Sequence, residues 1–386
     1  MPSPSDRIKE IVPSKSLEIA LKVLKLREEG HDVIGLHVGE ADFDTPSTII
    51  KSTQKALSEN KTKYDLVQGN LELRQSIAQR FNYLNQGSIT PQNIILGNGS
   101  KHILYNIFQS LLNPGDEVII PRPYWVTFPE SVKLAGGVPR FVAPSKGFQL
   151  DLDGIREAVG PKTKALVINS PNNPSGVIYP PHILSQLLTL AKEHDFMIIS
   201  DEAYEGFIYD GERPFSLYSL DKKALNNTIT VQSFSKTFSM TGFRIGYAIA
   251  SNSWVTHLKN LGGHQVGNIC TFAQYGALEA LSLSEGEMRP YVHELQERRD
   301  LAFNLFSSLF DCYKPQGGFC LFPNISKYIE EGRFTSSQSM ALEILEKAHV
   351  AVLPGEAFGL PEHLRLSFTP SKDDIKNAFQ KIKDFL

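Results

Sequence analysis

The chain contains few cysteines. There are three among its 386 residues, and no two of them form a CxxC pair. An odd number without metal-ligand spacing argues against a disulfide framework and against a cysteine-based zinc site. Such scarcity is typical of proteins kept in a reducing compartment. We therefore expect a cytoplasmic location, with Cys270, Cys312 and Cys320 as free thiols.

Long apolar runs and an excess of one charge are also missing. No hydrophobic segment approaches the ~20 residues that a membrane-spanning helix requires. The N-terminal residues lead into a charged helical pattern instead of the apolar core of a signal peptide. With 39 Lys and Arg against 42 Asp and Glu, the chain has no electrostatic footprint for nucleic acid or for an anionic membrane. We expect a soluble protein with neither partner.

Several motifs of nucleotide, metal and serine chemistry are absent or incomplete. Neither GxxxxGK[ST] nor HExxH occurs, which argues against a P-loop and against a metal site of that type. The segment Gly97-Asn-Gly-Ser-Lys-His102 begins like a dinucleotide fingerprint but lacks its third glycine. Ser233-Phe-Ser-Lys236 satisfies SxxK, the nucleophile motif of penicillin-interacting enzymes, without the accompanying KTG and SDN elements.

What the sequence does contain is an alternation of short apolar segments with helical patterns. A helix is predicted over residues 16–29, and strands are predicted over residues 33–36, 94–96, 117–120, 165–168, 196–199, 228–231 and 246–250. Continuous apolar strands separated by helices indicate a largely parallel sheet covered on both faces. Ligands bind such sheets beyond the carboxyl ends of the strands. We therefore predict a three-layer α/β/α domain with its site in the loops after the strands.

A different rhythm begins near residue 285. A long charged helix pattern over residues 289–310 precedes a glycine-rich turn, a strand over residues 349–353 and a final amphipathic helix from residue 372. These elements predict a smaller α+β domain that the N-terminal segment completes. We expect a large domain over residues 40–284 and a small domain formed by residues 1–39 and 285–386.

Lys236 is the most informative single residue. It follows the β-branched segment 228–231 and stands among small residues, with Arg244 eight residues later. Burying an unpaired ammonium is strongly unfavourable. Two neighbouring cations lower the pKa of the lysine and free its amine to attack a carbonyl. The pattern predicts a lysine that forms a Schiff base.

Three further elements follow predicted strands of the same sheet. Asp201 and Tyr204 come after residues 196–199, where Asp201 could pair with a ring nitrogen or simply cap a helix. The motif Asn169-Ser-Pro-Asn-Asn-Pro-Ser-Gly176 follows residues 165–168 and could be a turn without function. Residues 97–101, called here the glycine turn, precede a helix and could expose N–H groups to a phosphate or be a plain helix start. All of these elements would meet at one edge of the sheet.

In this order, the motifs Asn-Asn-Pro-Ser-Gly, Asp-Glu-Ala-Tyr and Ser-Phe-Ser-Lys-Thr-Phe-Ser-Met-Thr-Gly-Phe-Arg-Ile-Gly resemble those of the fold-type I, class I and II aminotransferases. Bacterial aspartate aminotransferases are the members that the chain resembles most. The resemblance runs from the N-terminal helix to Arg365-Leu-Ser-Phe368. It implies pyridoxal 5'-phosphate as cofactor and a homodimer with shared active sites.

The resemblance also implies roles for individual residues. Lys236 would be the Schiff-base lysine and proton shuttle, with Asp201 on the pyridine nitrogen. Asn173 and Tyr204 would bind the phenolic oxygen, and Tyr204 would count with Lys236 and Asp201 as catalytic. Trp125 would stack on the ring, although a core residue is the alternative. The phosphate ligands would be Gly99, Ser100, Lys101, Ser233, Arg244 and, from the neighbouring subunit, Tyr64, whose alternative is an aromatic beside a turn.

For the substrate, the resemblance implies that Arg365 binds the α-carboxylate through a bidentate fork. An arginine on an exposed strand face is the alternative. The further implied substrate ligands are Gly39, Trp125, Asn173 and, for a distal carboxylate, Lys101, which could equally be a solvated surface lysine. Asn268 matches a partner-subunit position, although Gly267 and Ile269 replace the commoner serine and proline around it. Ala41 stands where proline is commoner.

The function expected from the resemblance is amino-group transfer between an amino acid, aspartate above all, and 2-oxoglutarate by a ping-pong route. A broad, aromatic or neutral amino acid specificity is one alternative. A β-elimination lyase or a ring-closing synthase on the same fold is another. The third is a transcriptional regulator with an aminotransferase-like domain. The 38 residues before Gly39 are too few for the winged-helix DNA-binding domain of such a regulator.

Overall fold

A seven-stranded sheet forms the centre of the protein in this computed structural model, which describes residues 3–11, 15–213 and 215–386. Its strand order is β2-β8-β7-β6-β5-β3-β4, and only β8 runs antiparallel to its neighbours. The strands are β2 (Ile94–Gly97), β3 (Glu117–Pro121), β4 (Val138–Val142), β5 (Thr163–Asn169), β6 (Met197–Asp201), β7 (Thr228–Ser233) and β8 (Gly246–Ile249). The prediction of a mostly parallel sheet is confirmed.

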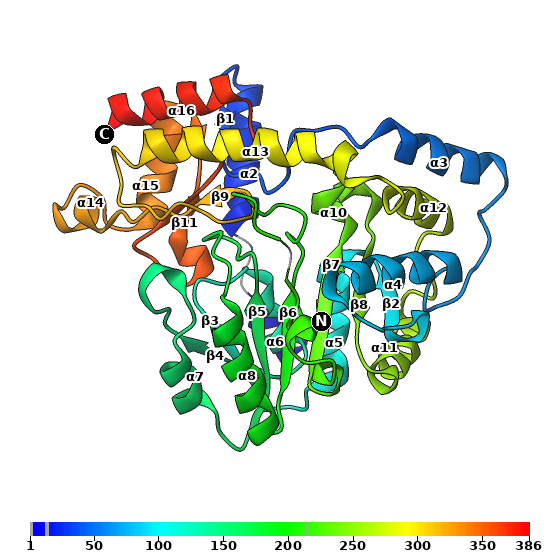
Figure 1. The fold of residues 1–386 in the computed structure, drawn as a ribbon. Helices are drawn as coiled ribbons and strands as arrows, with labels where there is room; N and C mark the ends of the chain where they lie inside the picture. The colour runs from blue at the N-terminus through cyan, green and yellow to red at the C-terminus, as the bar shows by residue number, and fades with distance from the viewer. Residues whose placement is uncertain (1–2, 12–14, 214) are drawn as a thin grey trace.

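Helices cover both faces of this sheet because its central strands are apolar on both sides. Val167 and Ile199 pack with α5, α6 and α11, whereas Leu166 and Ile198 pack with α7 and α8. At the β2 end, α3, α4 and α12 complete the layer (Figure 1). These helices are α3 (Ser47–Ser58), α4 (Leu71–Asn85), α5 (Gly99–Leu111), α6 (Thr127–Leu134), α7 (Leu152–Ala158), α8 (Pro181–Glu193), α11 (Asn252–Gln265) and α12 (Thr271–Ala280).

The C-terminal part and the N-terminal segment form a second group of elements. Its strands pair in the order β11-β12-β9, all antiparallel, and β1 pairs with β10 in parallel. Figure 1 shows the long helix α13 lying alongside α16, with β9 and β11 below α13. The elements are α2 (Lys15–Glu28), β1 (Ile34–Gly35), α13 (Glu285–Phe306), β9 (Cys320–Leu321), α14 (Ser326–Glu330), α15 (Ser337–Glu343), β10 (Val350–Ala351), β11 (Leu353–Pro354), β12 (Leu364–Ser367) and α16 (Lys372–Phe385).

One apolar cluster joins this group to the central sheet. It combines side chains of β1, α13 and α16 with Tyr204, Phe207 and Tyr209, which follow β6. The pairing of β1 with β10 agrees with the expectation that the N-terminal segment completes the second group. The boundaries predicted for the two domains, residues 40–284 against residues 1–39 and 285–386, stay a prediction.

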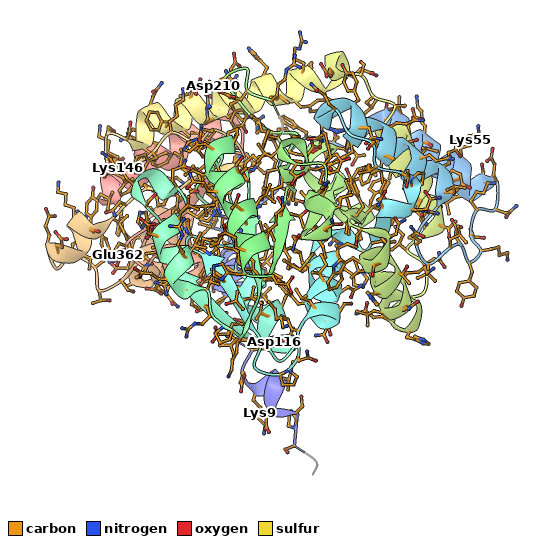
Figure 2. All side chains as sticks on the ribbon, turned by 60° about the horizontal axis from the view of Figure 1, so that its bottom comes forward. Lys9, Lys55, Asp116, Lys146, Asp210 and Glu362 are labelled. Atoms are coloured by element: carbon orange, nitrogen blue, oxygen red, sulfur yellow. The ribbon has the colours of Figure 1, made fainter. Side chains whose placement is uncertain are left out.

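The remaining elements of the described residues are short. They are α1 (Asp6–Lys9), α9 (Leu217–Leu220), α10 (Phe234–Thr237), five 3₁₀ turns (Pro91–Asn93, Lys146–Phe148, Ala224–Asn226, Thr241–Phe243, Gly355–Phe358) and a π turn (Ile344–Ala348). Figure 2 shows α1, with Lys9 labelled, projecting from the body of the protein. Within the described ranges, every helix is too short or too polar to cross a membrane.

Candidate active site

The predicted functional loops meet at one edge of the central sheet. β5, β6 and β7 are parallel, and β2 points the same way because it is antiparallel to β8, which is antiparallel to β7. The glycine turn, the motif of residues 169–176, Asp201 and Lys236 therefore lie at the carboxyl ends of four strands, at the same edge of the sheet. β8 begins there, which places Arg244 at this edge as well. The arrangement matches the expectation for ligand sites in such sheets.

Lys236 lies on α10, directly after β7, and its Nζ donates a hydrogen bond to the carbonyl oxygen of Gly39 at 2.6 Å. Burial is the main factor that lowers the pKa of Lys236 to about 8. The negative charge of Glu40 opposes this shift in pKa, while Arg365 and then Arg244 add to it. The lowered pKa is what the sequence led us to expect, but burial contributes more than the neighbouring arginine.

Asp201 is the last residue of β6 and is 3% exposed. One carboxylate oxygen accepts the Ala203 N–H at 3.1 Å. Burial raises the pKa of Asp201 to about 7, against the opposing effects of that hydrogen bond and of the charge on Lys236. A turn follows β6, so the alternative that Asp201 caps a helix is wrong. Tyr204 lies in this turn, buried, with its ring edge-on to Phe319 at 5.3 Å between centroids.

Asn169 joins the loops after β5 and β6, a contact that the sequence reasoning missed. Its Oδ1 accepts the backbone N–H of Asn173 at 2.7 Å, and its Nδ2 donates to the carbonyl oxygen of Asp201 at 2.9 Å. Both bonds are buried, which fixes Asn173 relative to Asp201. The available signal was the position of Asn169 as the last residue of β5 within the quoted motif.

The glycine turn packs tightly against Arg244. Gly99 begins α5 with φ +80°, and a Cβ there would lie 2.6 Å from Nη2 of Arg244. Arg244 in turn donates through Nη1 to the carbonyl oxygen of Thr241 at 2.8 Å. On the other side, a Cβ at Gly246 would lie 2.5 Å from the backbone nitrogen of Ser100. Backbone N–H groups and a guanidinium therefore converge at the start of a helix, which favours an anion.

Two more side chains extend the site from this turn. The Nζ of Lys101 lies 5.2 Å from the ring centroid of Trp125. Burial, and after it the charge of Arg244, lowers the pKa of Lys101. Trp125 is half-buried and packs edge-on against Phe128, so its ring borders both the core and the site. Ser233 ends β7, where its Oγ accepts the Ser235 N–H at 3.1 Å.

Arg365 lies on β12 and is 6% exposed, so the alternative of an exposed-face arginine is wrong. Its Nη2 donates to the carbonyl oxygen of His37 at 2.6 Å, and its Nη1 lies 3.4 Å from Oδ1 of Asn173. The third nitrogen, Nε, is buried and has no hydrogen-bond partner among the described residues. A Cβ at Gly39 would lie 3.8 Å from Nη2 of Arg365. Arg365 therefore faces the loop that carries Gly39.

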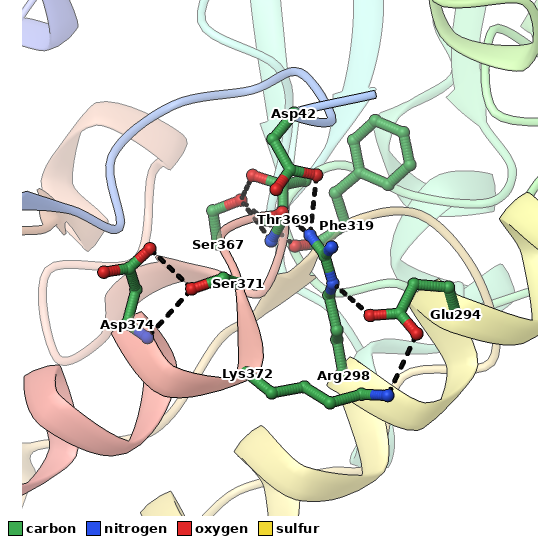
Figure 3. Close-up of polar contacts among 9 residues, drawn as sticks. All are labelled: Asp42, Glu294, Arg298, Phe319, Ser367, Thr369, Ser371, Lys372 and Asp374. Carbon is green, nitrogen blue, oxygen red and sulfur yellow. Dashed lines mark hydrogen bonds and ion pairs between the residues drawn. The ribbon is translucent and has the colours of Figure 1, made fainter. Parts of the chain in front are cut away.

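That loop, residues 37–46, is called here the N-terminal loop. Arg298 of α13 anchors it, because its Nη1 donates to Oδ1 of Asp42 at 2.7 Å and its guanidinium lies 5.2 Å from the ring centroid of Phe43. The same Nη1 bonds to the carbonyl oxygen of Thr369, and Nε bonds to Glu294 at 2.8 Å (Figure 3). No local pattern in the sequence predicts this anchor.

Two predicted residues lie away from these contacts. Tyr64 is 99% exposed, so its ring contacts little of its own chain. Asn268 donates to Thr271 Oγ1 at 3.1 Å, and that hydroxyl donates to the carbonyl oxygen of Lys63 at 2.8 Å. Tyr64 and Asn268 consequently line one surface hollow of about 410 Å³, together with Thr62, Lys63, Ile269, Cys270, Thr271 and Phe272.

The chemistry of the site fits a cofactor that has a phosphate, an aromatic ring nitrogen and a carbonyl. The glycine turn and Arg244 offer donors to a phosphate, and a Cβ at Gly99 would fill this cradle. Asp201 offers a buried carboxylate to a protonated ring nitrogen, and Lys236 offers an amine with a lowered pKa. The unpartnered Nε of Arg365 is a free donor for a carboxylate. No group of three or more metal-ligating side chains occurs in the described part of the chain.

Comparison with known proteins identifies the family. The family model "Aminotransferase class I and II" matches residues 31–382. A probable aspartate/prephenate aminotransferase of Aquifex aeolicus is 41% identical over 99% of this chain and 98% of its own length, and the Bacillus subtilis aspartate aminotransferase is 40% identical over 98% of each. The structure of Thermus thermophilus aspartate aminotransferase with maleate has a TM-score of 0.94 at 38% identity, with 100% of each chain covered. The chain belongs to the class I and II aminotransferases, and it is a pyridoxal 5'-phosphate-dependent transaminase of fold type I.

Proposed function

We propose that this aminotransferase uses Lys236 as its Schiff-base lysine, with the cofactor oriented by the residues around it. The phosphate would bind the hydroxyl of Ser100 and the N–H groups of Gly99, Ser100 and Lys101, together with Ser233 and Arg244. The ring would lie against Trp125, with Asp201 at its nitrogen and Asn173 and Tyr204 at its phenolic oxygen. The convergence of these groups at one sheet edge supports this assignment.

Bound pyridoxal phosphate supplies an electron sink that eases loss of the Cα proton of the substrate. The chain supplies the rest. Lys236, whose pKa is lowered to about 8, can hold the Cα proton at Nζ and deliver it to a second carbon. The carboxylate of Asp201 stabilises positive charge at the ring nitrogen. The backbone carbonyl of Asp201 accepts a hydrogen bond from Asn169, which holds Asp201 in place. Arg365 orients the α-carboxylate of the substrate through two parallel donors.

The proposed donor is aspartate, and the proposed acceptor is 2-oxoglutarate. The observation that carries this proposal is a second cation near the site, because Lys101 has its ammonium over Trp125 and experiences the charge of Arg244. A dicarboxylate can use Arg365 for one carboxylate and Lys101 for the other. Relatives named aspartate/prephenate aminotransferase favour prephenate as a second acceptor, since it too carries two carboxylates.

The test is a single-turnover reaction of the purified holoenzyme with aspartate, tyrosine or methionine, followed by absorbance. Aspartate should convert the cofactor to its amine form fastest and yield oxaloacetate. The cycle should then close with 2-oxoglutarate, and prephenate is assayed as an alternative acceptor. If aspartate leaves the spectrum unchanged while tyrosine converts it, the acidic-substrate proposal is lost. Release of ammonia and pyruvate from tyrosine, with phenol as the leaving group and the starting spectrum restored, would instead identify a β-elimination lyase.

Lys101→Met separates the substrate proposal from the cofactor proposal. Removal of the distal cation should raise KM for aspartate about tenfold or more and leave KM for methionine unchanged, because methionine has no second carboxylate. The exposed Lys164 provides a matched control, since Lys164→Met removes a lysine of the β5 strand that makes none of these contacts. Equal effects on both substrates would refute a role for Lys101 in specificity.

The active unit is proposed to be a cytoplasmic homodimer in which Tyr64 reaches the phosphate of the partner, with each chain divided into the two predicted domains. Support comes from Tyr64 itself, because it is 99% exposed yet lies beside Asn268 in the surface hollow. A second copy of this chain would cover both residues. Sedimentation should accordingly give twice the 43.0 kDa chain mass.

Mixed subunits test whether Tyr64 acts across the interface. Lys236→Ala and Tyr64→Ala are each expected to lose most activity. After the two are mixed and allowed to exchange, one site of each heterodimer combines an intact Lys236 with an intact Tyr64. Activity should therefore return toward a quarter of the wild-type value per total subunit. If activity does not return although exchange is complete, Tyr64 does not act across the interface.

A further inference from the structure

His102 closes the glycine turn from within the helix that follows it. It lies in the first turn of α5, and its Nδ1 accepts the backbone N–H of Asn98 at 3.1 Å. Asn98 precedes the helix as its N-cap residue, and its own side chain makes no capping hydrogen bond. In a capping box, the side chain of the N3 residue reaches back to the N-cap N–H. Here a histidine makes the equivalent bond from N4, one residue further along the helix.

The contacts of His102 select one form of the imidazole. Because a backbone N–H can only donate, Nδ1 must carry a lone pair. The proton is then on Nε2, which lies 2.7 Å from Oε1 of Gln265 at the end of α11. The Nδ2 of Asn106, one helical turn further along α5, lies 3.3 Å from the same Nε2 and, as a donor, makes no hydrogen bond to a protonated Nε2. The neutral Nε2–H tautomer satisfies two of the three contacts, those to Asn98 and Gln265, whereas the other tautomer satisfies only the contact to Asn106 and sets its Nδ1–H against the N–H of Asn98.

The bonded N–H belongs to the residue directly before the proposed phosphate ligands. The carbonyl oxygen of Asn98 lies 3.4 Å from Nη2 of Arg244, so Asn98 is contacted from both sides. Gly99 follows with φ +80°, and there is no room for a Cβ between it and Arg244. Any rotation at Asn98 would turn the N–H groups of residues 99–101 away from a common point. The turn therefore depends on its N-cap residue being fixed.

We propose that His102 is a positioning residue for the cofactor phosphate, which it serves by accepting the Asn98 N–H and so fixing the N–H groups of residues 99–101. This inference rests on the proposed placement of the phosphate at the glycine turn. His102 itself does not contact the cofactor. Its effect is specific to the phosphate, because the ring and carbonyl of the cofactor are assigned to Asp201, Tyr204 and Lys236.

The experiment compares pyridoxal phosphate with pyridoxal, which lacks the phosphate. Full-length apoprotein, resolved from the holoenzyme, is titrated with each ligand and followed by absorbance. His102→Phe keeps an aromatic ring but removes the acceptor, and it should weaken pyridoxal phosphate binding roughly five- to tenfold, as expected for the loss of one hydrogen bond. Pyridoxal affinity should stay within about twofold of wild type. His102→Gln, whose amide oxygen can accept the same N–H, should restore most of the pyridoxal phosphate affinity.

Two control variants and the comparison with pyridoxal make the outcome decisive. His182→Phe changes an exposed histidine on α8 and should alter neither affinity. Ser100→Ala tests the proposed phosphate site separately, and if it leaves pyridoxal phosphate binding unchanged, that placement is wrong. If Ser100→Ala weakens binding while His102→Phe does not, only the inference about His102 fails. An equal loss of pyridoxal and pyridoxal phosphate affinity in His102→Phe would also overturn it, because a general structural defect would then explain the result.

Discussion

Replacement of Gly99 by alanine should weaken cofactor binding while the fold stays intact. The residue has φ +80°, a conformation that costs an L-amino acid about 1–2 kcal/mol. In addition, the new Cβ would lie 2.6 Å from Nη2 and 3.1 Å from Cζ of Arg244. The guanidinium is exposed on its other side, so it can retreat and leave the backbone in place. The retreat removes a charge-assisted donor from the proposed phosphate position.

The expected magnitude follows from these two contributions. Loss of a hydrogen bond to a charged group costs about 1.5–3 kcal/mol, so the Kd for pyridoxal phosphate should rise about 10- to 100-fold. The conformational cost should appear separately as about 1–2 kcal/mol of lost stability in urea unfolding of the apoprotein. Gly115 provides the matched control, because it has φ +85° and nothing lies within 4 Å of its added Cβ.

Gly115→Ala should therefore lose a similar amount of stability and no cofactor affinity. The affinities are measured by titration of apoprotein with pyridoxal phosphate, and pyridoxal serves as the phosphate-free comparison. If Gly99→Ala binds pyridoxal phosphate as tightly as wild type, the phosphate is not held by Arg244 beside the glycine turn. If Gly115→Ala loses affinity as well, the effect of Gly99→Ala cannot be attributed to its contact with Arg244.

Three further predictions follow from the contacts at the site. Arg365→Lys should raise KM for the amino donor about 10- to 100-fold in steady-state assays, because an ammonium cannot form the bidentate fork; an unchanged KM would exclude it as the carboxylate ligand. Arg298→Met should lower the free energy of unfolding by only about 1–2 kcal/mol in thermal unfolding, because Asp42, which loses its partner, is 46% exposed to water. The same variant should raise KM for the amino donor. Lys372→Met, which leaves the N-terminal loop anchored, should not change KM. The pKa of Asp201 is raised to about 7 from an ordinary value of 3.8, so the folded apoprotein binds more protons than the unfolded chain in that window, and stability should fall as the pH rises from about 4 to 7 in urea titrations. Asp201→Asn should show a smaller decline, because the buried Glu202, whose pKa is raised to about 8, still contributes to it.

Much of the fold was predictable because the central strands are apolar on both faces. Every strand predicted for the central sheet is present within a few residues of its predicted position. One strand of the observed sheet is missing from the prediction. That omission is β4, a strand at the sheet edge that is largely exposed and contains Pro139. An edge strand needs neither a continuous apolar run nor every backbone donor, so its sequence resembles a loop. The sequence predicts that residues 97–101 precede a helix, whereas α5 already begins at Gly99, because glycine and serine are typical of turns.

The site was predictable where its residues follow strands and unpredictable where it depends on distant segments. Asp201 and Lys236 could be placed because parallel strands end at one edge. The bond between Lys236 and Gly39 joins residues 197 positions apart, and no local pattern signals it. Arg298 is a similar case, since its partner Asp42 lies 256 positions away. The burial that dominates the pKa of Lys236 is likewise a property of the assembled core and not of the neighbouring sequence.

The N-terminal loop has a consequence for ligand selection. Its main-chain oxygens accept hydrogen bonds from both principal cations of the site, His37 from Arg365 and Gly39 from Lys236. A ligand oxygen that binds Nη2 of Arg365 replaces the carbonyl oxygen of His37 as the acceptor. Only the difference in strength between these two hydrogen bonds therefore favours ligand binding. Bonds to an ionised acceptor are roughly twice as strong as bonds to a neutral one. At these two nitrogens the peptide oxygens thus set a threshold that a carboxylate exceeds and an amide or alcohol does not, so the chain screens its ligands for charge there through a competition with its own backbone.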